Sequence, residues 1–220
     1  HAAHLAVAHS FNEHVSATIE LDAGFDAAKT AAYPFQGSPF DVQEAYATYQ
    51  TGIFAISGGK FAAWEGLEVI EGPPNPTITR GYSFNMAEPN THTGVQVQLA
   101  SETVAFAAGL VNGWDTLLDN NDAKTLIAKL AYTPSSAFTI NVNGTFGAET
   151  EDVDDQQRLS LDLNGAWSPS ERFELRFQAN FGMDEIGAEP GTVHWYVFGL
   201  QPFYTGEVFT FGARAEFFAD

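Results

Sequence analysis

Apolar and polar residues alternate one by one along much of this chain. In the segment 172–182, every second side chain is apolar (Phe173, Leu175, Phe177, Ala179, Phe181) and the intervening ones are polar (Glu174, Arg176, Gln178, Asn180). Because successive side chains of a β-strand point to opposite faces, such a strand has one apolar and one polar face. The same period of two recurs at residues 15–23, 95–99, 138–146, 159–165 and 209–217. The pattern predicts an all-β chain.

A soluble β-sandwich also alternates, but two properties of these strands favour a transmembrane barrel. The predicted strands span about nine to eleven residues, the length that crosses a bilayer at a tilt, whereas soluble strands average about five or six. The polar faces carry Asn, Gln, Thr and charges of both signs, as expected for a wet lumen. Short turns, such as 50–52 and 168–171, also alternate with longer acidic links, such as 112–124, 148–156 and 183–191. We therefore expect a transmembrane antiparallel up-and-down β-barrel.

We expect about twelve strands, near residues 3–10, 15–24, 40–49, 53–62, 92–100, 103–111, 125–132, 137–147, 157–167, 171–181, 192–200 and 207–217. With the short turns on the periplasmic side, the first strand runs inward and the last runs outward. Bacterial barrels have an even strand number, with both ends expected on the periplasmic side. We therefore expect a native barrel of about fourteen or more strands, of which residues 1–220 form one incomplete domain.

Residues 63–91 interrupt this regularity. The stretch contains four prolines and keeps no period of two, yet it is too rich in apolar side chains for a disordered segment. We expect a long external loop that folds into the lumen and narrows it, with its path fixed by the rigid Pro73–Pro76 turn. The predicted constriction residues are Trp64, Glu65, Glu68, Glu71 and Arg80.

Charged side chains on the polar faces are candidates for the lining of a pore: Glu20, Asp22, Lys129, Asp162, Glu174, Arg176, Arg214 and Glu216. They could instead form cross-strand ion pairs that steady the wall, each worth up to about 1 kcal/mol. Acidic residues outnumber basic ones in this set, which predicts a modest cation preference. Aromatic residues near strand ends, among them Trp167, Trp195, Tyr132, Tyr196 and Tyr204, are expected in interfacial girdles.

The remaining composition indicates no catalytic, metal or cofactor site. The net charge of −19 makes nucleic acid an improbable partner, since phosphate binding requires a basic surface. The six histidines show no metal-ligand spacing, and no nucleophile-elbow motif occurs. The acidic run 149–155 lacks the spacing of a calcium loop, so a solvated external loop is the simpler interpretation.

Several motifs follow one another in a fixed order along the chain: Lys60-Phe61, Trp64 to Ile70, Tyr82-Ser83-Phe84, Thr91 to Val95, Asn112 to Asp115, Asp119 to Lys124, Tyr132-Thr133-Pro134 and Arg214 to Phe218, with Gln43 to Tyr46 in an early strand. Together they resemble the motifs of the β-barrel porins of the OmpL-like group. The resemblance covers residues 40–220. It implies a pore in the outer membrane of a Gram-negative bacterium, and it supplies no catalytic residues. Family members are longer and end in an aromatic residue, whereas this sequence stops at Asp220.

The sequence thus predicts a non-enzymatic, porin-like channel for passive diffusion of small hydrophilic solutes or ions, without a cofactor. Its expected partners are outer-membrane lipid, lipopolysaccharide, the solutes and a possible second copy of the chain. A structural or plugged barrel without transport is the main alternative. A membrane-embedded hydrolase and a soluble ligand-carrying barrel are the others.

Overall fold

The computed structural model describes residues 2–72, 74–186 and 191–220. Thirteen β-strands occur in these ranges: β1 (Ala2–Ser10), β2 (Val15–Gly24), β3 (Phe40–Thr51), β4 (Phe54–Ala62), β5 (Thr91–Ala100), β6 (Val104–Val111), β7 (Thr125–Ser135), β8 (Phe138–Ala148), β9 (Gln157–Ser170), β10 (Phe173–Ile186), β11 (Gly191–Thr205), β12 (Thr210–Gly212) and β13 (Ala215–Ala219). Two short helices, α1 (Ala27–Thr30) and α2 (Tyr82–Met86), lie in the links. Neither they nor any other described helix has the length and apolar character to cross a membrane.

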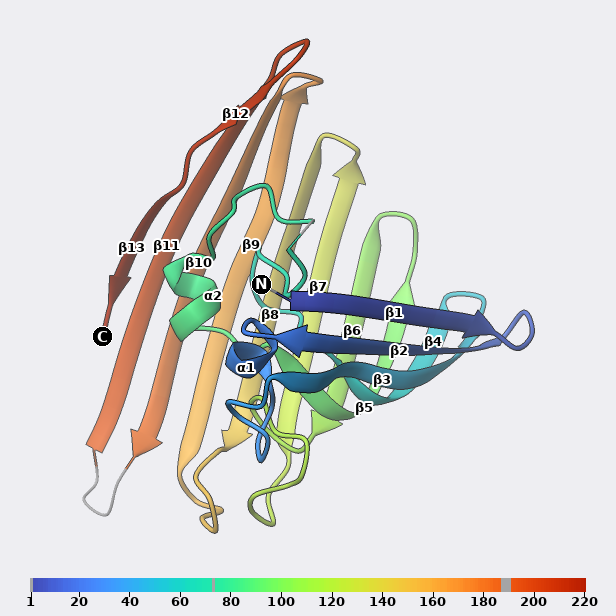
Figure 1. Cartoon of the computed structure of the whole chain (residues 1–220), viewed down its shortest axis with the longest axis vertical. Coiled ribbons are helices and arrows are strands. Elements are labelled where there is room, and N and C mark those ends of the chain that lie inside the picture. Colours follow the sequence, from blue (N-terminus) through green and yellow to red (C-terminus); the bar gives the residue numbers. More distant parts are fainter. Residues whose placement is uncertain (1, 73, 187–190) are drawn as a thin grey trace.

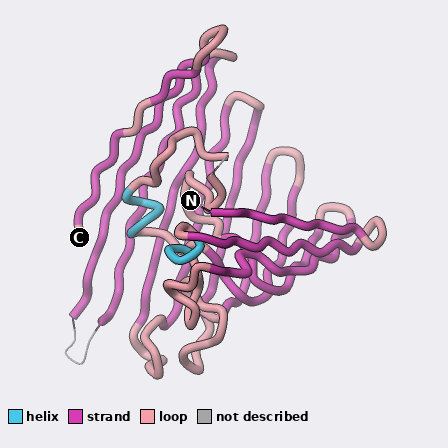
Figure 2. The backbone as a smooth tube through the Cα atoms, in the orientation of Figure 1, coloured by secondary structure: helices cyan, strands magenta, loops and turns pink. Residues whose placement is uncertain are grey.

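The strands form one antiparallel up-and-down sheet in which each strand pairs with its sequence neighbours from β1 to β12, while β13 pairs with β11. The sheet is strongly curled, so that β1–β3 run nearly across the direction of β9–β11 (Figures 1 and 2). The all-β, antiparallel up-and-down architecture predicted from the alternation is confirmed. Among the described residues, β1 pairs only with β2.

The distribution of side chains is the reverse of that in a soluble domain. Large apolar side chains are exposed on one face of the strands, including Leu5, Ile19, Val95, Leu130, Val142, Leu161 and Phe198. Polar side chains are buried on the other face, including Asp22, Asp41, Lys60, Asn143, Asp162, Gln178 and Asn180. Soluble proteins rarely expose contiguous apolar surface on this scale, whereas a membrane barrel turns its apolar band toward lipid. The fold is that of an outer-membrane barrel.

The last predicted strand, 207–217, is interrupted. β12 pairs with β11 at Phe203 to Thr205 and β13 pairs with it at Tyr196 to Leu200, which leaves a gap opposite Pro202. Proline has no backbone N–H to donate to a neighbouring strand. Beside this gap, the Arg214 side chain donates hydrogen bonds to Thr79, in the segment between β4 and β5.

The acidic link predicted at 183–191 is shorter than expected, because β10 continues to Ile186. Asp184 accepts hydrogen bonds from the Arg158 guanidinium on β9, and Glu185 accepts one from the Gln157 amide at 2.9 Å. Through these cross-strand hydrogen bonds, the acidic residues Asp184 and Glu185 form part of β10 rather than of a link. Residues 187–190 of the predicted link, like Pro73 of the predicted turn, lie outside the described residues.

The placement of Trp195 in a lipid-facing girdle is wrong. Its indole Nε1 donates to Asn180 Oδ1 at 2.8 Å, and its ring lies 6.2 Å from that of Trp114. Asn180 is 3% exposed and belongs to the polar face, so Trp195 lies on that face too. By contrast, Trp167, Tyr132, Tyr196 and Tyr204 are each at least 45% exposed.

Candidate functional site

The link between β4 and β5, here called the 63–90 segment, is bonded to the polar face of strands far away in the sequence. Glu65 accepts hydrogen bonds from Thr145 Oγ1 on β8 at 2.6 Å and from Ser160 Oγ on β9 at 2.5 Å. The Gly66 amide donates to Asp162 Oδ1 on β9 at 3.2 Å. In Figure 1, α2 of this segment lies in front of β9 and β10, to the left of β1–β3. Thr91, the last residue of the predicted loop, is the first of β5.

A second carboxylate of the segment is tied to the same region. Glu88 accepts hydrogen bonds from Gln178 Nε2 on β10 at 2.8 Å and from Ser83 Oγ at 3.0 Å. Gln178 Nε2 also donates to Asp162 Oδ2 at 2.7 Å, which joins the carboxyl groups of Glu88 and Asp162 in one network. Gly66 has a positive φ of 96°, and an added Cβ would lie 2.3 Å from Glu88 Oε1. Only glycine fits there.

Burial changes the protonation of these two loop carboxyls. Burial raises the pKa of Glu65 to about 7, against the hydrogen bonds from Ser160 and Thr145 that lower it. Burial also raises the pKa of Glu88 to about 8, and the Asp162 charge raises it further. Both groups therefore hold a large share of their protons near neutral pH, which removes repulsion from Asp162.

Arg214 makes the third connection, from the interruption before β13. Its guanidinium pairs with Glu68 at 3.0 Å and donates to Thr79 Oγ1 at 2.9 Å. Glu68 also accepts a hydrogen bond from the Gly81 amide at 2.6 Å. Next to it, Glu216 accepts one from the Tyr82 amide at 3.2 Å, at the start of α2. The segment is thus bonded to β8, β9, β10 and β13.

The other predicted constriction residues have different roles. Arg80 Nη2 donates to the backbone oxygens of Ile70 and Glu71, so it braces the segment internally. The Glu71 side chain interacts electrostatically with His4 and Glu20, on the opposite strands β1 and β2. Trp64 packs against a small apolar cluster formed by Phe61, Val111 and Ile127.

The predicted lining residues all lie on the polar face, but most have partners. Asp22 hydrogen-bonds His4 at 2.7 Å, and Glu20 lies 3.7 Å from the same imidazole. Glu174 pairs with Arg176 on its own strand at 2.5 Å, and Arg214 pairs with Glu216 at 3.1 Å. Asp162 is fully buried in the network described above. These contacts agree with the ion-pair interpretation, and the lining of a pore by these side chains stays a prediction.

Sequence reasoning missed the buried ion pair of Lys60 and Asp41. Lys60 Nζ lies 2.9 Å from Asp41 Oδ2 and 2.8 Å from the Val42 oxygen, and the two side chains are 3% and 5% exposed. Opposite charges on adjacent predicted strands were the available signal. The strand register that brings the two charges together could not be predicted. A bulge in β3 and a glycine of positive φ, Gly59, shift the alternation there.

The acidic run 149–155 and the run 119–122 form one hydrogen-bonded unit at the loop end. Glu149 accepts hydrogen bonds from the Trp114 amide and Thr125 Oγ1, both at 2.6 Å, and burial raises its pKa. Asp154 accepts hydrogen bonds from the amides of Asp122 and Ala123. These carboxylates organise the loops. Among the described residues, no group of three or more acidic or histidine side chains is arranged to hold a metal ion.

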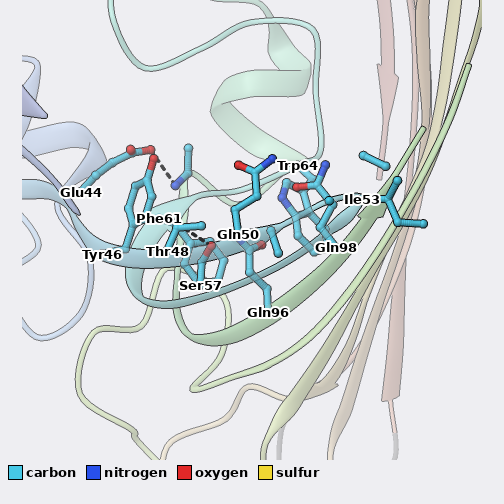
Figure 3. Close-up of a pocket in the computed structure, with 14 residues that line it drawn as sticks. Glu44, Tyr46, Thr48, Gln50, Ile53, Ser57, Phe61, Trp64, Gln96 and Gln98 are labelled. Carbon is cyan, nitrogen blue, oxygen red and sulfur yellow. Dashed lines mark hydrogen bonds between the residues drawn. The ribbon is translucent and has the colours of Figure 1, made fainter. Parts of the chain in front are cut away.

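Open space remains beside the 63–90 segment, along the polar face of β3, β4 and β5. A cavity of about 360 Å³ is lined by residues of these strands, of the turn at Gly52 and Ile53, and by Trp64 of the segment (Figure 3). A smaller cavity of about 120 Å³ shares Trp64 and Gln98 with it and reaches Lys129 on β7. Space thus remains along β3 to β5, while the hydrogen bonds of the segment go to β8, β9, β10 and β13.

Comparison with known families supplies the identity of this architecture. The family described as Putative beta-barrel porin-2, OmpL-like, matches residues 1–220, which is more than the 40–220 expected from the motifs. The chain belongs to this family. Family and fold place it in the outer membrane of Gram-negative bacteria and support a porin-type channel.

A solved structure agrees on the fold. OccK5 (OpdH) of Pseudomonas aeruginosa superposes with a TM-score of 0.51 at 13% identity, covering 99% of this chain and 60% of its own. This chain thus spans about 60% of the length of OccK5. A loop-deletion mutant of OmpT, an outer membrane protein of Vibrio cholerae, gives a TM-score of 0.47 at 11% identity, covering 98% and 85%. A search of curated protein sequences gives no match.

Proposed function

We propose that this porin-family barrel is a passive diffusion channel for small hydrophilic solutes and ions, with no enzymatic activity. The observation that carries the proposal is the polar interior with open space beside the 63–90 segment, enclosed by strands whose apolar side chains face outward. Selectivity in such channels depends on the width of the passage and on the groups that line it.

In this proposal the 63–90 segment is the constriction. Its hydrogen bonds to β8, β9, β10 and β13 hold it across the barrel interior, so that solutes pass along β3 to β7. Glu65, Glu68 and Arg80 keep the segment in place, while Trp64 faces the remaining space.

The test is single-channel conductance of the purified protein in planar bilayers. We expect stable open steps, and we expect replacement of residues 64–88 by a short Gly-Ser linker to increase the step size severalfold, because the widest obstruction is removed. Deletion of residues 151–153, which shortens a loop at the same end of the barrel, is the control and should leave the step size close to that of the original chain. An unchanged conductance in the linker variant would mean that the segment does not restrict the passage.

A plugged barrel remains the second candidate, because so many hydrogen bonds fix the segment to the wall. In that case the original chain would be silent in bilayers and only the linker variant would conduct. Silence of both proteins, with heat-modifiable migration on gels proving that they are folded, would exclude a channel.

A further inference from the structure

The larger cavity, here called the β3–β5 cavity, has a lining that the channel proposal alone does not explain. It extends from Gln50 and Gly52, at the short-turn end, to Glu44 and Trp64, beside the 63–90 segment. Its volume of about 360 Å³ falls within the roughly 300–1,000 Å³ of small-molecule sites. A space of this size could hold a solute during passage.

Three aromatic side chains line the β3–β5 cavity. Tyr46, Phe61 and Trp64 contribute to it, and Figure 3 shows Trp64 beside Gln98. Trp64 is held in position because it packs against the Phe61, Val111 and Ile127 cluster, as Tyr46 does. A fixed aromatic face is suited to stacking against the flat C–H surface of a ring.

The same lining carries neutral hydrogen-bonding groups. Gln50, Gln96 and Gln98 supply amides, each with a donor and an acceptor group. Gln96 Oε1 itself is buried and has no hydrogen-bond partner in the structure. A buried polar atom without a partner is unfavourable unless a ligand or water satisfies it.

Charge is scarce in this lining. Among the described residues around the β3–β5 cavity, only Glu44 has a charged side chain, and it already accepts a hydrogen bond from the Ala62 amide at 2.8 Å. The basic side chain of Lys129 lines the neighbouring smaller cavity instead. An anionic solute would therefore lack a counter-charge here, and the lining contains no second carboxylate for a cation.

We propose that the β3–β5 cavity is a binding subsite for neutral polyhydroxylated solutes, that is, carbohydrates. The sugar ring stacks on Trp64, and its hydroxyl groups pair with the amides of Gln50, Gln96 and Gln98. This inference rests on the proposed channel function, since the subsite lies on the proposed path. Binding must be weak enough for the solute to leave, with a Kd of about 1 mM or higher.

The test combines two readouts on the whole chain. Isothermal titration calorimetry in a detergent without a sugar headgroup measures binding of glucose and sucrose, with glucuronate as the charged counterpart. Bilayer recordings measure the reduction of ion current by the same sugars. We expect saturable binding of the neutral sugars, at least tenfold weaker binding of glucuronate, and partial current block by sucrose.

Trp64→Ala should weaken sugar binding at least tenfold, while Trp64→Phe should retain most of it because an aromatic face remains. If Trp64→Ala does not fold, the double variant Gln96→Ala, Gln98→Ala serves instead and should show the same loss. Sugar binding without any ion current would overturn the channel but keep the subsite. Ion current without sugar binding, equal binding of glucuronate, or undiminished binding by Trp64→Ala would overturn the subsite.

Discussion

At the scale of single residues, the buried Lys60–Asp41 ion pair shows how polar side chains inside the protein affect the free energy of unfolding. Removing one partner of a buried ion pair leaves an uncompensated charge, which costs about 3–5 kcal/mol. We therefore expect Lys60→Met to lower the free energy of unfolding by about 3 kcal/mol or more, measured by urea titration of the folded barrel in detergent.

The double variant Lys60→Met, Asp41→Asn should recover most of that loss, because it removes both charges. Lys124→Met is the matched control: Lys124 pairs with Asp119 but its side chain is half exposed, so the change should stay below about 1 kcal/mol. Equal destabilisation by the single and double variants would show that the pairing of charges is not the cause.

Sequence reasoning could find residues with a distinctive local pattern, but not those defined by contacts far away in the sequence. Trp64 and Glu65 stand out locally, as an aromatic and a charge inside an irregular stretch. Their partners do not, because Thr145 and Ser160 lie 80 and 95 residues away and occupy ordinary strand positions. Glu88 was missed altogether, since nothing local distinguishes a carboxylate that will be buried.

At the scale of elements, docking of the 63–90 segment should depend on pH. Glu65 and Glu88 have an ordinary pKa of 4.5, and burial raises it to about 7 and about 8 in the docked segment. The docked state therefore binds more protons than the released state, and docking weakens as pH rises from about 4.5 through 8. Below pH 4.5 both states are protonated and this penalty is absent.

We accordingly expect a larger single-channel conductance, or more frequent open steps, at pH 9 than at pH 5. The double variant Glu65→Gln, Glu88→Gln should reduce that difference, because neutral amides cannot ionise. Glu102→Gln, in the short turn between β5 and β6, is the control and should keep the pH dependence of the original chain. A pH response that persists undiminished in the double variant would assign it to other groups.

The strands themselves were predictable because alternation is a local property that each strand carries in its own sequence. Their ends were not, since they depend on neighbours: Asp184 stays in β10 because Arg158 faces it, and the final strand breaks opposite Pro202. Trp195 shows the same limit, since its position near a strand end suits a girdle until Asn180 and Trp114 are found beside it.

At the scale of the whole molecule, the excess of acidic residues should give the channel a modest preference for cations. The net charge is −19, and acidic side chains outnumber basic ones among the predicted lining residues. An acidic surface attracts cations and raises their local concentration, an effect that salt screens. We expect reversal potentials in a KCl gradient to show K⁺ favoured over Cl⁻ by a few fold at low salt, decreasing at about 1 M. Anion preference at low salt would contradict the assignment.

The long reach of Arg214 has a consequence for how the protein is assembled. Arg214 and Glu68 are separated by 146 residues, and Glu65 and Ser160 by 95. Contacts of such separation form late, because the intervening chain must be ordered first. The 63–90 segment can therefore take its final position only after β8–β10 and β13 are in place. Until then, the interior of the barrel lacks the constriction that the docked segment forms in the proposed channel.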